Sequence, residues 1–191
     1  MEPRKRSGKA NEIKVISENL TGKATLLIGD SITKNMERFS SSYPRFFPTS
    51  TVLNAGIAGD TVEAILYRVD VMNIPSSVSH LSLLCGTNNL CSHSPATISS
   101  TLTEILFLLR RKCPTAYIHL FPILPRFDHL QTHVAAINSC IFFQLRELFP
   151  EFVFFHELPS SLFNQNLYRP DRTKALQQEG MTFLSGGFTT A

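Results

Sequence analysis

A serine directly follows the first apolar run of the sequence, and its surroundings could make it a nucleophile. The run at residues 24–28 leads into Gly29, Asp30 and Ser31. Glycine allows a sharp turn, and a serine that opens a helix has an exposed hydroxyl and a backbone N–H with no partner inside the helix. Serine is also an ordinary N-cap residue, so this motif alone does not decide between a cap and a nucleophile.

Two later segments could supply hydrogen-bond donors to the same chemistry. The apolar run at residues 51–55 is followed by a loop that contains Gly59, and the run at 81–85 is followed by Asn88. A backbone N–H in a glycine loop and a side-chain amide can both stabilise the oxyanion that forms when a serine attacks an ester. Taken singly, each segment is also an ordinary turn before a helix.

The elements that must position these residues follow an alternating pattern. Short, almost continuously apolar runs are typical of strands buried on both faces, and they occupy residues 24–28, 51–55, 81–85, 116–121 and 152–155. Apolar residues at helical spacing predict helices over residues 61–71, 96–112 and 129–148. Ser94 and Pro95 fit the N-cap and first position of the second of these helices. Residues 40–50 are expected to form an irregular loop.

This alternation predicts an α/β protein with three α/β/α layers and a parallel five-stranded sheet of the flavodoxin-like type. In open parallel sheets, ligands bind at the carboxyl ends of the strands. The segments that contain Ser31, Gly59 and Asn88 all follow strands, so we expect them to meet at one edge of the sheet.

Composition favours one ordinary globular domain. The chain has 191 residues, of which 43% are hydrophobic and 17% charged. We expect a polar, disordered leader over residues 1–21 and one domain over 22–191 that has a short carboxyl-terminal end. The net charge is only +3 and its excess lies in the leader, so nothing indicates strong nucleic-acid binding. No run is long enough to span a membrane, and no secretory signal follows the basic start.

The cysteines and histidines do not predict a metal site. The four cysteines lack CxxC spacing and the six histidines lack HExxH spacing, so we expect free thiols, no metal and no cofactor. Unpaired cysteines without a secretory signal indicate a cytoplasmic location.

Taken together, the three segments resemble a known family. GDSI, NAGIAGDT and GTNN are similar to the first three sequence blocks of the SGNH (GDSL-like) hydrolases. The stretch from NAGIAGDT to GTNN, and the later FPILPR, most resemble the catalytic subunits of platelet-activating-factor acetylhydrolase. Esterase domains in the first open reading frame of LINE retrotransposons look similar too. The resemblance covers residues 24–180 and implies an esterase that acts on short acyl esters and forms a homodimer.

The resemblance also implies roles for particular residues. Ser31 would be the nucleophile, and Asp30 would support its turn. The oxyanion hole would consist of the N–H groups of Ser31 and Gly59 and the side chain of Asn88. Asp171 matches the aspartate of the family's last block, where a histidine normally follows three residues later.

That histidine is missing from the sequence. Its position is Lys174 when counted from Asp171, or Ala175 when counted back from Gly180. A serine without its base loses on the order of a millionfold in turnover, although the oxyanion hole and binding still leave roughly 10³–10⁴ over water. We therefore expect an impaired esterase.

Several alternatives stay open. Lys174 could act as the base, although Asp171 nearby opposes loss of its charge. His93 and His129 lie in loops that follow strands and could reach the same edge of the sheet. The chain could also be a non-catalytic binding or interaction module, or a degenerate or alternatively spliced copy of an active retrotransposon-derived relative.

Overall fold

The structure is a computed structural model that describes residues 22–157. The predicted leader, Asp171 and Lys174 lie outside the described residues, and so does Ala175. The expectations that concern them stay predictions.

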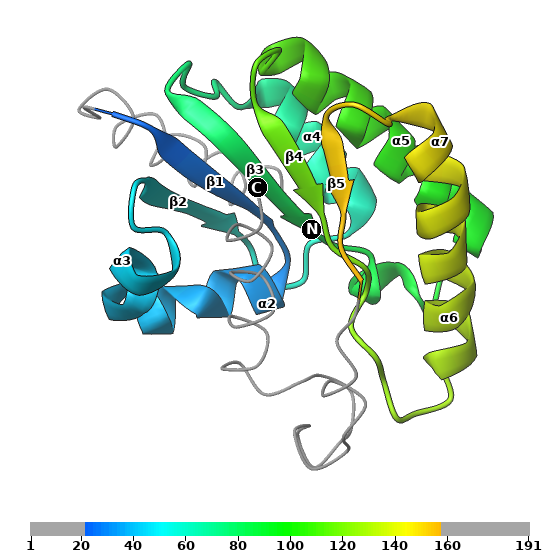
Figure 1. Cartoon of the computed structure of the whole chain (residues 1–191). Coiled ribbons are helices and arrows are strands. Elements are labelled where there is room, and N and C mark those ends of the chain that lie inside the picture. The colour runs from blue at the N-terminus through cyan, green and yellow to red at the C-terminus, as the bar shows by residue number, and fades with distance from the viewer. Residues whose placement is uncertain (1–21, 158–191) are drawn as a thin grey trace.

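Five strands form one sheet in which every pair is parallel. The strands are β1 (Ala24–Gly29), β2 (Thr51–Gly56), β3 (Val78–Leu84), β4 (Tyr117–Leu120) and β5 (Val153–Phe155). Their order in the sheet is β2-β1-β3-β4-β5 (Figure 1). The predicted parallel five-stranded sheet is confirmed, and β3 begins three residues before the predicted run. All six residues of β1 are buried, as expected for a strand covered on both faces.

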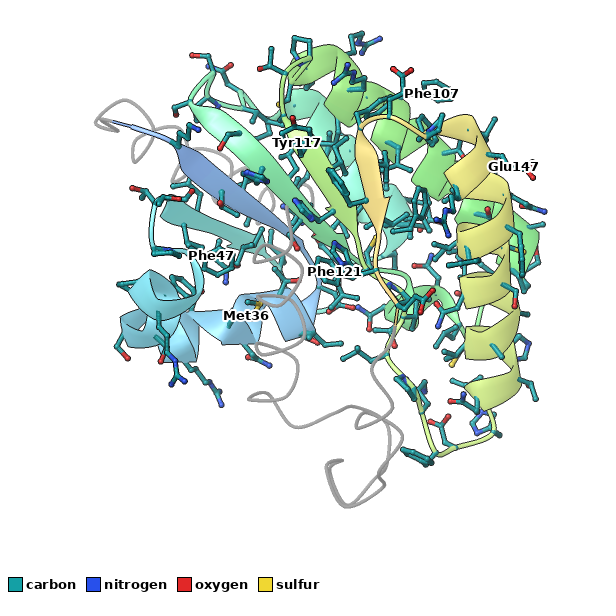
Figure 2. The ribbon with its side chains drawn as sticks, in the orientation of Figure 1. Met36, Phe47, Phe107, Tyr117, Phe121 and Glu147 are labelled. Carbon is teal, nitrogen blue, oxygen red and sulfur yellow. The ribbon has the colours of Figure 1, made fainter. Side chains whose placement is uncertain are left out.

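Helices cover both faces of this sheet and make the three predicted layers (Figure 1). One layer is formed by α2 (Ser31–Asn35), η1 (Met36–Ser42) and α3 (Tyr43–Phe46), and the other by α4 (Val62–Val71), α5 (Pro95–Lys112), α6 (Gln131–Cys140), η3 (Ile141–Leu145) and α7 (Arg146–Leu148). The larger core lies under α4, α5 and α6. A smaller core of Leu27, Met36, Phe47, Leu84 and Phe121 lies on the other face (Figure 2).

Local signals explain where α5 begins. The Ser94 side chain accepts a hydrogen bond from the N–H of Thr97, 3.1 Å away, and Pro95 is the first helical residue. Buried residues such as Ile98, Leu102 and Ile105 then recur at helical spacing. No helix within residues 22–157 is long and apolar enough to cross a membrane.

Two expected elements differ from the structure. The irregular loop predicted over residues 40–50 is wrong, because η1 and α3 occupy much of it and Phe47 is buried in the smaller core. Pro44 lies in the first turn of α3, where its missing N–H costs nothing. The helix predicted over 129–148 is interrupted by the π-helical turn η3. Such turns contain one extra residue, which shifts the faces of the helix.

The strand order places a switch point between β1 and β3 at the carboxyl edge of the sheet, where open α/β sheets have a crevice. The chain passes from β1 to β2 on one side and then returns to β3 on the other side of β1. Ligands of open α/β sheets bind at such a switch point, outside the carboxyl ends of the two strands. Ser31 directly follows β1, and Asn88 follows β3 by four residues.

Candidate active site

Two glycines bring α2 into direct contact with the sheet. A Cβ atom on Gly29 would lie 2.1 Å from Thr33 Oγ1 and 2.4 Å from the Leu84 carbonyl oxygen. A Cβ atom on Gly56 would lie 2.2 Å from the backbone nitrogen of Lys34. Only glycine allows such close contact between backbones. The position of the helix that begins with Ser31 is therefore fixed by β1 and β2.

Asp30 caps this helix and supports the turn, as expected from the sequence. Its Oδ1 accepts a hydrogen bond of 2.8 Å from the N–H of Ile32, and its side chain is buried. Ser31 is half-buried at the first helical position. Because it directly follows β1, Ser31 lies at the carboxyl edge of the sheet.

The loop after β2 places Gly59 beside this edge. The N–H of Ile57 donates to the Gly29 carbonyl, 3.0 Å away, and so joins the loop to the end of β1. The N–H of Asp60 donates to the Ile57 carbonyl, and Gly59 has φ +80°, the geometry of a type II turn. No backbone hydrogen bond among residues 22–157 uses the Gly59 N–H. That donor is therefore available to a ligand.

Asn88 contacts the same loop. Its Nδ2 donates a hydrogen bond of 2.8 Å to the Asp60 carbonyl oxygen. The amide nitrogen has two hydrogens, so one can still be donated to a ligand. The structure thus brings the segments of Ser31, Gly59 and Asn88 together at the crevice between β1 and β3.

A buried ion pair that the sequence analysis missed holds these segments together. Arg68 on α4 donates through Nε to Asp60 Oδ2 over 2.8 Å, and neither side chain is exposed. Its Nη1 donates to the Ala55 carbonyl over 2.7 Å, and its Nη2 lies 3.4 Å from the Gly29 carbonyl. One guanidinium therefore joins β1, β2 and the loop that contacts Asn88. The available signal was a charged residue on the apolar stripe of the predicted helix 61–71.

The second asparagine of GTNN has a structural role. Asn89 is fully buried, and its Oδ1 accepts a hydrogen bond of 3.0 Å from the N–H of Val62 at the start of α4. Its Nδ2 donates to Glu63 Oε2 over 2.9 Å. Asn89 and Thr61 together satisfy the first N–H groups of α4. Asn88 thus contacts the loop of the candidate site, whereas Asn89 contacts the start of α4.

We expect Asn88→Ala to lower mainly the turnover and Asn89→Ala to lower mainly the stability. With Asn88 as an oxyanion donor, Asn88→Ala should lower turnover by about 10²–10³-fold. The same variant should cost only about 1 kcal/mol of stability, because it removes one part-buried hydrogen bond. Asn89→Ala leaves buried groups of α4 without a partner and should cost about 1–3 kcal/mol. Urea unfolding and the rate of ester hydrolysis measure the two effects. Equal losses of stability would contradict this division.

The structure separates the two candidate histidine bases, since only His93 is shown with partners. His93 Nδ1 lies 2.8 Å from Ser92 Oγ, and its Nε2 lies 3.3 Å from Glu63 Oε1, so both ring nitrogens are engaged. His129 is exposed in the loop after β4. The carboxylate of the adjacent Asp128 binds Arg126, and this hydrogen bond lowers the pKa of Asp128.

Three histidines form a hydrogen-bonded row across one face of the sheet. His80 Nδ1 lies 3.1 Å from His119 Nε2, and His119 Nδ1 lies 3.0 Å from His156 Nε2. Burial lowers the pKa of His119 to about 3, and His156 and His80 act in the same direction. Burial also lowers the pKa values of His80 and His156. All three rings are therefore neutral in the folded protein near pH 7.

Cys85 directly follows β3 and is buried. Burial, followed by the charge of Asp30, raises the pKa of its thiol well above the usual range. All four cysteines are free thiols, but only Cys85 and Cys113 are buried, whereas Cys140 is partly buried and Cys91 is exposed. No cluster of three or more His, Cys, Asp or Glu side chains within residues 22–157 could hold a metal ion.

No family model and no curated protein sequence matches the chain. Solved structures do match. A Bacteroides thetaiotaomicron GDSL-like lipase is 15% identical, with a TM-score of 0.71 and coverage of 94% of this chain and 95% of its own. AlinE4, an SGNH-hydrolase family esterase, is 20% identical to the chain, with a TM-score of 0.55. The match covers 71% of this chain and 77% of AlinE4.

The protein therefore has the fold of the SGNH (GDSL-like) hydrolases, and the predicted fold class is confirmed. A Streptococcus pneumonia protein described as a candidate platelet activating factor has this fold too. It is 19% identical to the chain, with a TM-score of 0.73, and the match covers 97% of this chain and 92% of that protein.

Proposed function

We propose that the protein is a serine ester hydrolase of the SGNH type, acting on small acyl esters, with Ser31 as its nucleophile. The observation that carries the proposal is the convergence of three loops at the crevice between β1 and β3. Ile57 joins the Gly59 loop to β1, and Asn88 joins that loop to β3. A nucleophile beside two donors is the arrangement that acyl transfer requires.

The proposed reaction has two steps, acylation of Ser31 and hydrolysis of the acyl-serine. Ser31 Oγ attacks the ester carbonyl carbon, and its proton passes to solvent water. The C–O bond to the alcohol then breaks, and the alcohol takes up a proton from water. The Gly59 N–H and Asn88 Nδ2 donate to the oxygen that becomes negative in the transition state. Water then attacks the acyl-serine, releases the carboxylic acid and restores the hydroxyl.

The missing histidine makes proton removal from Ser31 the slow event in this proposal. Neither Lys174 nor Ala175 supplies an imidazole, and His93 has both ring nitrogens engaged in the structure. Loss of the histidine costs on the order of a millionfold in turnover, of which a positioned general base alone recovers about 10²–10⁴-fold. The chain should therefore hydrolyse esters slowly, although Asp171 matches the aspartate of the family's last block.

We expect a histidine at position 174 or 175 to raise hydrolysis of p-nitrophenyl acetate. The variants are Lys174→His and Ala175→His, each compared with the natural chain. The position that completes the triad should increase turnover by about 10²–10⁴-fold, because the serine proton then has an acceptor. The increase should be absent when Ser31→Ala is added.

Ser92→Ala is the matched control for Ser31→Ala. Ser92 is an exposed serine whose hydroxyl contacts His93, so it could give background hydrolysis without an oxyanion hole. The proposal requires Ser31→Ala to abolish the activity above background and Ser92→Ala to keep it. If the natural chain, Lys174→His and Ala175→His all hydrolyse the ester at the rate of Ser31→Ala, Ser31 is not a nucleophile.

The missing histidine also favours a second candidate function. A domain that keeps the crevice but lacks the base would serve as a binding or interaction module. The same assay separates the two candidates. If the natural chain is inert and a new histidine gives it Ser31-dependent activity, the natural protein is a binding module whose esterase site lacks only the base. If the natural chain itself shows slow Ser31-dependent turnover, the protein is an enzyme.

A further inference from the structure

An open groove of about 770 Å³ lies between the exposed sides of α4 and α5. The two helices pack against each other (Figure 1). Both run from the carboxyl edge of the sheet to its amino edge, because each connects the end of one parallel strand to the start of another. Each helix contributes about two turns, roughly 10 Å, to the groove. The groove is therefore long enough to hold a short helix.

Apolar side chains of the groove are open to solvent. Leu66 lines it from α4 and Leu108 from α5. Tyr67 and Phe107 line it as well, and they are 47% and 58% exposed. Val71, one turn after Tyr67 on α4, is 49% exposed. Single exposed apolar residues need no explanation, but several that gather at one place mark an interaction site.

Acidic side chains border the same groove. The charged residues that line it are Glu63, Asp70, Glu104 and Arg111, so carboxylates outnumber the guanidinium by three to one. Glu63 is paired with His93, but no ion pair within residues 22–157 includes Asp70 or Glu104. The whole chain has a net charge of +3. The groove is thus a local acidic surface on a chain of the opposite sign.

We propose that this groove binds a basic amphipathic helix of a partner protein. Apolar side chains of that helix lie against Tyr67 and Phe107, where burial removes them from water. Its lysines or arginines lie beside Asp70 and Glu104, and the opposite charges select and orient the partner. Proteins that bind a helix in a groove use apolar anchors at the same helical spacing. This interaction does not depend on hydrolysis by Ser31.

Two other occupants fit the groove less well. The chain itself has four cations within residues 4–9, but Met1 is the only large apolar side chain among residues 1–11. These cations therefore lack the apolar stripe that the groove requires. A second copy that used the same face would bring the carboxylates of Asp70 and Glu104 against identical carboxylates. A separate basic helix matches both the apolar walls and the charge.

Designed peptides test the proposal through the chemistry of the occupant. Each is a helix of about 14 residues made of leucine, alanine and one charged residue type. The lysine peptide has its leucines along one stripe, and the glutamate peptide replaces every lysine. A scattered peptide keeps the lysines but distributes the leucines around the helix. Fluorescence anisotropy measures binding to the full chain. The lysine peptide should bind about tenfold more tightly than either of the others.

A pair of charge variants places the binding on the groove. Glu104→Lys reverses a charge that lines it, and Glu147→Lys makes the same change at an exposed position of α7 outside it (Figure 2). Both variants change the net charge equally, but only Glu104 lies beside the proposed helix. Glu104→Lys should weaken binding of the lysine peptide by about tenfold, and Glu147→Lys by less than about twofold.

A pair of apolar variants tests the stripe of leucines. Phe107→Ser removes a ring from the groove, and Phe143→Ser removes an exposed ring of η3 that does not line it. Phe107→Ser should abolish the preference for the lysine peptide over the scattered peptide, and Phe143→Ser should keep it. Circular dichroism checks the fold, because Phe107 also contacts Phe149. If Phe107→Ser does not fold, Tyr67→Ser on α4 tests the same wall.

Equal binding of the lysine and glutamate peptides overturns the inference. Equal losses in Glu104→Lys and Glu147→Lys overturn it too, because the attraction would then come from the overall charge. A preference for the lysine peptide that survives in Phe107→Ser also contradicts it.

Two results would identify another occupant and so overturn the proposed partner. One is peptide binding that becomes about tenfold tighter in a variant with Arg4→Ser, Lys5→Ser, Arg6→Ser and Lys9→Ser. The chain's own basic residues would then fill the groove. The other is a dimer in analytical ultracentrifugation that the lysine peptide converts to a monomer, since a second copy would then occupy it.

Discussion

Arg68→Met is expected to lower the free energy of unfolding by about 3–5 kcal/mol, because it leaves the buried Asp60 carboxylate without its counter-charge. Methionine fills a similar volume, so the loss comes from the removed charge and from the hydrogen bonds to the Ala55 and Gly29 carbonyls. The measurement is urea unfolding followed by circular dichroism.

Arg111→Met is the matched control, since Arg111 lies exposed on α5. It should change stability by less than about 0.5 kcal/mol. If Arg68→Met does not fold, Arg68→Lys keeps the charge but loses the planar guanidinium that reaches two carbonyls at once. Its unfolding midpoint should lie clearly below the natural one. An unfolding midpoint of Arg68→Met equal to that of Arg111→Met would contradict the role we assign to the ion pair.

The pH dependence of stability is expected to reflect the row of histidines. The folded protein keeps His119 neutral down to a pKa of about 3, whereas the unfolded chain takes up a proton near 6.5. This contribution to stability is complete above pH 6.5 and is lost as the pH falls towards 3. The slope approaches about 1.4 kcal/mol per pH unit for this residue alone. His80 and His156, whose pKa values are also lowered, act in the same direction.

His119→Phe should flatten this dependence. The ring lies stacked against Phe154 with centroids 5.2 Å apart, so phenylalanine keeps an aromatic contact while removing the titrating group. Unfolding free energies at pH 7 and pH 5 give the slope for each protein. His133→Gln, at an exposed position of α6, should keep the natural slope. A slope for His119→Phe as steep as the natural one would place the pH dependence elsewhere.

The residues of the candidate site could be found from the sequence because their signals are local. Each functional segment contains a turn residue directly after an apolar run, and parallel pairing then brings such turns to one edge. The Ser94–Pro95 start of α5 was recognised for the same reason. These features require only neighbouring residues and the direction of the strands.

The interactions between segments could not be found in this way. Arg68 and Asp60 are eight residues apart, and their pairing depends on how α4 packs over the sheet. The histidine row depends on strand register. His80 is opposite Tyr117, and His119, two residues further along β4, points to the same face of the sheet. A single sequence gives neither register nor helix packing. The short helices within residues 40–50 were missed because they depend on the burial of Phe47 rather than on helical periodicity.

The burial of Cys85 makes it an internal sensor of opening. Its thiol stays protonated and out of contact with water as long as β3 remains covered, so alkylating reagents react with it only during transient opening of the structure. In a protein whose three other cysteines, Cys91, Cys113 and Cys140, have been replaced, the labelling rate of Cys85 therefore measures how often the structure opens around it. A change that loosens the turn of Ser31 would be visible as faster labelling, even where overall unfolding is unaltered.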